Sequence, residues 1–121
     1  MRSDAEWKEI LSSLEYLDGT HRELFSFFSA KICNSSCYDK ILEHALAYFI
    51  YRHCSEAHDE SEYRSALGMC LLLERLLASL LYIFSPKNFE AVIEIARVIS
   101  EEVEYSEENT DAIKFEFFCI S

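Results

Sequence analysis

Two cysteines and two histidines have the spacing that most resembles a metal site. They are Cys33, Cys37, His53 and His58, in the pattern Cys-x3-Cys followed by His-x4-His. Thiolates and imidazoles at such intervals are typical ligands of structural zinc. However, the segment between the two pairs has the apolar periodicity of one helix, from about residue 38 to 53. Cys37 and His53 would then lie about 24 Å apart along the helix axis, so we expect no metal and no cofactor.

A nucleophilic catalytic site is the second chemistry to consider, because His53 stands directly before Cys54. A thiol becomes a nucleophile when a histidine contacts it, but neighbouring residues on a helix point about 100° apart. The chain also lacks a G-x-S-x-G motif and a glycine-rich phosphate loop, and it contains two glycines in all. We therefore expect that the protein is not an enzyme.

Carboxylates form the third group, and their distribution along the chain is uneven. The 121 residues include 22 acidic and 11 basic residues, which gives a net charge of −11. Residues 1–58 contain nine acidic and six basic residues, whereas residues 59–121 contain thirteen and five. Seven acidic residues and one basic residue fall within residues 101–116. A face of this kind favours a basic protein partner and disfavours direct binding to nucleic-acid phosphate.

Part of this acidic run, Glu107, Glu108 and Asp111, has an ordinary explanation. These residues lie in the first turns of a helix predicted to begin after Ser106, where negative charge interacts favourably with the helix dipole. Glu101, Glu102 and Glu104 lie near the end of the preceding helix, where negative charge is unfavourable. A local conflict of this kind is typical of a functional surface. We predict a partner-binding site that consists of Glu101, Glu102, Glu104, Glu107, Glu108 and Asp111.

The elements that must position these residues are predicted to be helices. Two glycines and one proline are too few for the turns of an all-β protein. Capping boxes at Ser3 and Thr20, a capping signal at Asp59 and the pair Ser85-Pro86 mark helix starts. Together with the apolar periodicity, they predict helices over about residues 4–17, 20–32, 38–53, 62–84, 86–103 and 107–120.

The helix over residues 62–84 is predicted to be central, because its apolar residues cover nearly its whole circumference. We do not expect it to span a membrane, since its longest uncharged run, residues 76–86, has 11 residues and a span needs about 20. Residues 113–117 alternate like a strand, so a short strand is the alternative for the C-terminal segment. The predicted fold is one all-α domain over residues 1–121, with five to six helices.

The five cysteines and the lack of an apolar export signal predict reduced thiols and a cytoplasmic location. The aromatic residues cover more than one helical face of their segments. Most belong in the core, but some, such as Phe27 and Tyr51, would remain exposed as a partner or homodimer interface.

Three functions follow from these patterns. The leading one is a small acidic, non-enzymatic binding module that neutralises a basic partner such as a nuclease toxin, as an immunity protein or antitoxin does. The second is a secretion chaperone or helical adaptor, which would need an exposed aromatic groove for an apolar client segment. The third is a helical-bundle metal-binding protein that uses His53, Cys54, Glu56 and His58.

Overall fold

The computed structural model describes residues 3–29 and 38–118, and every element within these ranges is helical. These two ranges contain six α-helices and one π-helix: α1 (Asp4–Ser12), α2 (Thr20–Phe25), α3 (Asp39–Cys54), α4 (Glu60–Phe84), α5 (Phe89–Ile99), η1 (Ser100–Glu104) and α6 (Glu107–Phe118). The predicted all-α class is confirmed. The C-terminal segment is a helix as far as residue 118, so the alternative of a strand there is wrong.

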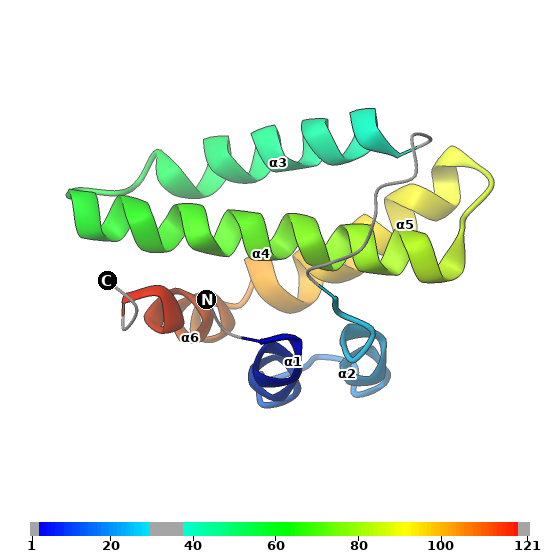
Figure 1. Ribbon diagram of the computed structural model, residues 1–121, viewed down its shortest axis with the longest axis horizontal. Helices are drawn as coiled ribbons and strands as arrows, with labels where there is room; N and C mark the ends of the chain where they lie inside the picture. The colour runs from blue at the N-terminus through cyan, green and yellow to red at the C-terminus, as the bar shows by residue number, and fades with distance from the viewer. Residues whose placement is uncertain (1–2, 30–37, 119–121) are drawn as a thin grey trace.

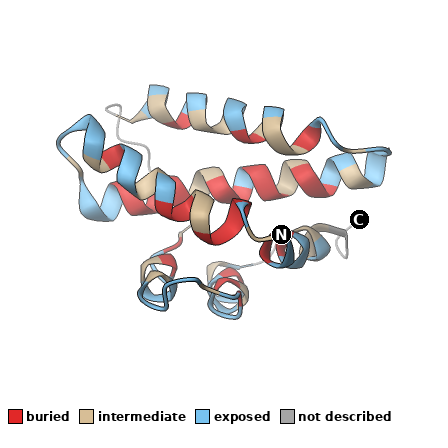
Figure 2. Ribbon diagram, turned by 180° about the vertical axis from the view of Figure 1, so that it is seen from behind, coloured by how far each residue is buried: buried red, intermediate tan, exposed pale blue. Residues whose placement is uncertain are grey.

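Helix α4 forms the axis of the fold (Figure 1). Helix α3 packs along one side of it, while α6, α1 and α2 lie on the other side and α5 folds back from its C-terminal end. Buried side chains line much of α4, and α3 buries a narrower stripe (Figure 2). The predicted central position of this helix is therefore correct. By length and composition alone α4 could also cross a membrane, but 56% of its most apolar window is buried inside the protein.

Close packing of α6 against α4 depends on a glycine. A Cβ atom at Gly68 would overlap the ring of Phe117, so only a residue without a side chain lets this ring lie directly against the α4 backbone. Phe117 also stacks on Trp7, with 5.2 Å between the ring centroids. The same contact therefore joins α6, α4 and α1.

Two of the four predicted helix caps are confirmed and two are wrong, although α2 begins at Thr20 as predicted. Ser3 forms its capping box with Glu6, and the Asp59 carboxylate accepts from the backbone N–H of Glu62 (2.8 Å). At Thr20 no capping box forms, because its N–H and hydroxyl both donate to the carboxylate of Asp18, at 2.9 and 2.7 Å. An Asx turn thus replaces the expected cap.

The start of α5 also differs from the prediction. Ser85 does not cap α5, because it ends α4 in the left-handed region, with a φ of 42°. The N-cap of α5 is Asn88, whose side-chain oxygen accepts from the N–H of Ala91 (2.8 Å). Helix α5 therefore begins three residues later than Pro86.

Candidate functional site

The acidic run begins on the π-helix η1, which continues directly from α5. Its wider turn is marked by the N–H of Tyr105, which donates to the carbonyl of Ser100 five residues earlier (3.0 Å). Residues two apart on a helix point to roughly opposite sides, so Glu102 and Glu104 leave η1 in different directions. Both carboxylates are buried.

Glu102 points to the connection between α1 and α2, residues 13–19. One of its oxygens accepts from the N–H of Leu17 (2.7 Å), and the other accepts from the N–H of Asp18 (3.1 Å) and contacts Nδ1 of His21. The residue is 1% exposed. A carboxylate with three N–H neighbours is a satisfied buried charge, and here it fixes the course of the connection.

Asn109, at the first turns of α6, completes this attachment. Its amide nitrogen donates to the carbonyls of Glu15 and Glu102, both at 2.6 Å, and its oxygen accepts from the N–H of Glu15 (2.9 Å). These bonds explain why the helix does not continue to residue 17. Ser13 and Leu14 still bond to the preceding turn, but from Glu15 on the backbone N–H groups of Glu15, Leu17 and Asp18 bond to Asn109 and Glu102 instead. Leu17, predicted to lie on the apolar face of that helix, is 86% exposed.

Glu104 points the other way, to the end of α3. Its carboxylate contacts Nε2 of His53 at 2.7 Å, the hydroxyl of Ser100 at 2.6 Å and Nε of Arg52 at 3.6 Å. Burial opposes ionisation of Glu104, but the hydrogen bonds from His53 and Ser100 and the positive charges of His53 and Arg52 outweigh it, so its pKa is lowered. Glu104 therefore stays ionised inside the fold.

The six residues of the predicted partner-binding site consequently fall into three groups. Glu102 and Glu104 are buried and cannot contribute to a surface, so their inclusion in an acidic face is corrected by the structure. Glu101 is partly exposed, and its carboxylate pairs with the guanidinium of Arg97. The remaining three lie exposed on the first turns of α6: Glu107, Glu108 and Asp111.

A fourth acidic residue joins them from a distant part of the chain. Because Asn109 holds the backbone of Glu15, the Glu15 side chain lies within hydrogen-bonding reach of Glu108. The contact raises the pKa of Glu108, first through that hydrogen bond and then through the repulsion between the two carboxylates. We call the exposed set the acidic surface; it consists of Glu15, Glu107, Glu108 and Asp111.

An apolar groove lies elsewhere on the molecule, between α2, the end of α4 and α5. It has a volume of about 240 Å³, and its lining is formed mainly by Leu24, Leu80, Phe84, Ile95 and Val98. Phe27, which is exposed as the sequence predicted, packs edge-on against Phe84 with 6.1 Å between centroids. Tyr51, the other aromatic residue predicted to be exposed, lies on α3 and is also exposed.

The residues considered for metal or thiol chemistry are separated. Within residues 3–29 and 38–118 no group of three or more His, Cys, Asp or Glu is placed to hold a metal ion, and Cys33 and Cys37 lie outside these ranges. The ring of His53 contacts Glu104. Burial, followed by the neighbouring Cys54, raises the pKa of the Cys70 thiol to about 12, which makes it a protonated core side chain.

The buried polar cluster was not predicted from the sequence. The sequence around Asn109 indicates only that it follows the predicted cap Ser106. Nothing in the sequence around His21 and His53 predicts that each contacts a carboxylate 50 or more residues away. The one available signal was the unfavourable charge at the end of α5. Comparison with protein-family models, curated proteins and solved structures gives no match for this chain.

Proposed function

We propose that this protein is a non-enzymatic binding module that captures and neutralises a basic protein partner, in the manner of an immunity protein or antitoxin. The observation that carries the proposal is the contact between Glu15 and Glu108. The fold places two exposed carboxylates against each other without an intervening base among the described residues. Like charges in contact destabilise the free protein, and a cationic group from a partner would relieve that repulsion.

The rest of the acidic surface supports the same reading. Glu107, Glu108 and Asp111 lie within one turn of α6, so their side chains gather on one face of that helix. With a net charge of −11, this face would attract a basic partner over a distance of about one Debye length and raise the association rate. Occlusion of the partner's phosphate-binding groove is the proposed mechanism of neutralisation.

The test compares two variants that remove the same charge. In the first, Glu15, Glu107 and Glu108 are replaced by Gln; in the second, Glu9, Glu43 and Glu90, which are exposed on other helices, are replaced by Gln. Partners are captured from the native host by each form, and the association rate of the purified partner is measured at several salt concentrations. We expect the first variant to associate about tenfold more slowly at low salt and the control to associate nearly as fast as the wild type. Equal rates for both variants would refute the proposal.

The apolar groove favours a second candidate function, that of a helical adaptor for an apolar client segment. An exposed groove with aromatic and aliphatic walls is the feature that this function requires. The two functions differ in their response to salt. Binding through the groove would be nearly independent of ionic strength and would be lost on replacement of Phe84 by Ser, whereas binding through the acidic surface would weaken as salt is added.

A further inference from the structure

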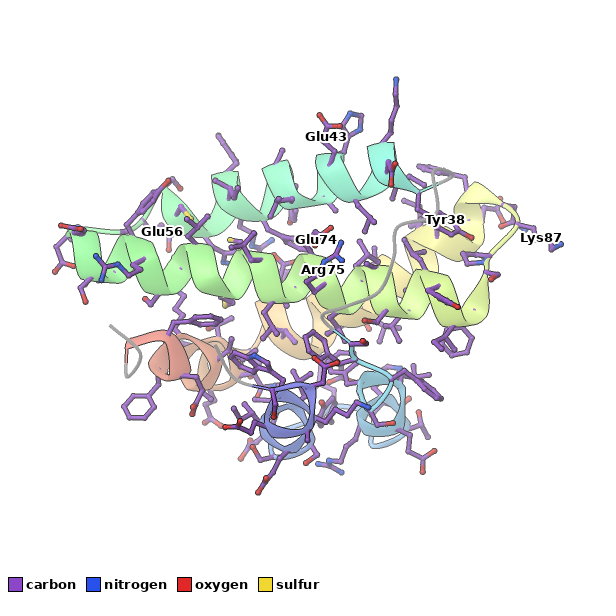
Figure 3. The ribbon with its side chains drawn as sticks, in the orientation of Figure 1. Tyr38, Glu43, Glu56, Glu74, Arg75 and Lys87 are labelled. Carbon is purple, nitrogen blue, oxygen red and sulfur yellow. The ribbon has the colours of Figure 1, made fainter. Side chains whose placement is uncertain are left out.

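A second cavity of about 400 Å³ lies at the opposite end of α4 from the apolar groove. It is formed where α3 ends, α4 begins and α6 passes beside them, and Glu56, at the turn between α3 and α4, is on its edge (Figure 3). Unlike the groove, it has polar walls. The polar side chains in its lining are His53, Glu56, Glu62, Ser65, Asp111 and Lys114.

His53 is the most constrained of these groups. Its side chain is 9% exposed, and its Nε2 lies 2.7 Å from the carboxylate of Glu104, which is fully buried. The ring therefore donates its Nε2–H to Glu104, as a histidine does when a carboxylate fixes its tautomer. Its other ring nitrogen, Nδ1, makes no hydrogen bond with another described residue.

Carboxylates also line the cavity. The carboxylates of Glu56 and Asp111 make no hydrogen bond or ion pair with another described residue. One carboxylate oxygen of Glu62 accepts from the backbone N–H of His58 (2.7 Å), and its other oxygen makes no hydrogen bond with a described residue. Against these three carboxylates the lining has two basic side chains, Lys114 and His53, so carboxylates are in excess in the wall.

We propose that this cavity binds the charged end of an alkyl guanidinium or alkyl ammonium group. Such a group supplies several N–H donors and a positive charge, which complements the free carboxylate oxygens and their excess over the basic side chains in the wall. Its alkyl chain would lie against Ala57, Ala66 and Phe115. The group comes either from a free small molecule or from an Arg or Lys side chain of the basic partner, and only the second source rests on the proposed function.

The test uses N-butylguanidinium and the neutral isostere N-butylurea at constant ionic strength. Each is titrated into the full-length protein, and the ring protons of His53 are followed by NMR. We expect a saturable shift of the His53 signals with butylguanidinium, and none with butylurea. Replacement of both Glu56 by Gln and Asp111 by Asn should weaken the binding about tenfold, whereas replacement of Glu43 by Gln, which points away from α4 (Figure 3), should not change it.

Three results would overturn the proposal: no saturable shift at His53, equal shifts with butylurea, or binding that the Glu56 and Asp111 replacements leave unchanged. The comparison of the two probes uses the wild-type protein, so it stands even if the double variant is unstable. Displacement of a captured partner by butylguanidinium identifies a partner side chain as the source. Undiminished partner binding with a saturated cavity identifies a free small molecule, and the proposed capture of a basic partner then depends on the acidic surface alone.

Discussion

Helix η1 and the start of α6 carry the two halves of one acidic run, yet they use their carboxylates in opposite ways. On η1, Glu102 and Glu104 point inward, and each contacts a histidine of a different helix. On α6, Glu107 and Glu108 point outward, and Glu108 contacts another carboxylate. The two halves have a similar density of acidic residues along the sequence. One half nevertheless anchors the fold through buried carboxylates, while the other exposes carboxylates that repel each other.

Asn109 is the residue that connects the two halves. Its amide bonds to the carbonyl of Glu102 on one side and to the backbone of Glu15 on the other. The buried half therefore positions the exposed half: the connection held by Glu102 and Asn109 carries Glu15 to the side of Glu108. The binding surface that we propose depends on the anchor for its shape, although the two differ in chemistry.

The strongest test of this division is the replacement of Glu102 by Gln. The amide is nearly the same size, but its NH₂ group would face either the N–H of Leu17 or the donors of Asp18 and His21, which leaves at least one buried donor without an acceptor. We expect a loss of about 3 kcal/mol in the free energy of unfolding, measured by denaturant titration. Glu43→Gln, on the exposed side of α3, is the matched control and should retain wild-type stability.

The next largest effect is expected for Asn109→Ala. This change leaves the N–H and carbonyl of Glu15 without partners and should cost about 2 kcal/mol of stability. It should also release Glu15 from Glu108, so that the pKa of Glu108, measured by NMR titration, falls back toward its ordinary value. A raised Glu108 pKa that persisted in this variant would show that the two halves are positioned independently.

Much of the fold follows from the sequence, and two of the exceptions share one cause. Helices α3, α4 and α6 were predicted within a few residues, because each has an apolar face or a cap within its own sequence. The end of α1 and the buried position of Glu102 on η1 could not be predicted in this way, since both involve hydrogen bonds between segments more than 80 residues apart. Local periodicity contains no information about such partners.

Only the exposed part of the candidate site was predicted correctly, because the buried part depends on contacts between distant segments. The exposed position of Glu107, Glu108 and Asp111 agrees with their place in the first turns of a helix. The unfavourable charges near the end of α5 indicated a functional surface, but Glu102 and Glu104 instead contact His21 and His53 inside the fold. Acidic residues at the end of a helix can form an exposed binding surface, or they can be buried against a partner inside the fold. Only the tertiary structure distinguishes these two cases.

A pH-dependent test sharpens the comparison through Glu104. Its pKa is lowered in the folded state, so the unfolded state binds protons more readily at acidic pH. Its stabilising contribution is complete above the ordinary value of 4.5 and is lost as the pH falls below that value through the lowered pKa. We expect Glu104→Gln to cost about 2 kcal/mol at neutral pH and to flatten the loss of stability between neutral pH and pH 3.

The control for this experiment is Glu43→Gln, an exposed carboxylate on α3 outside the η1 cluster. Its curve of stability against pH should keep the acid limb of the wild type. An acid limb equally steep in Glu104→Gln would mean that other carboxylates account for the acid sensitivity.

The smallest effect, and the one of opposite sign, is expected for Glu108→Gln. The pKa of Glu108 is raised by Glu15, so its contribution is favourable at low pH and is lost as the pH rises through the raised value. Removal of the charge should therefore leave stability at pH 7 equal to or slightly above that of the wild type. Thermal unfolding at pH 4 and pH 7 checks this. A Tm at pH 7 below that of the wild type would contradict the claim that Glu15 and Glu108 repel each other at the surface.

The most direct measurement is the difference in free energy of unfolding between Glu102→Gln and Glu108→Gln at neutral pH. The chemical change is the same, and the two residues are six positions apart in one acidic run. We predict that Glu102→Gln loses about 3 kcal/mol relative to the wild type, while Glu108→Gln is at least as stable as the wild type. Equal losses in the two variants would contradict the division of the run into a buried anchor and an exposed binding surface.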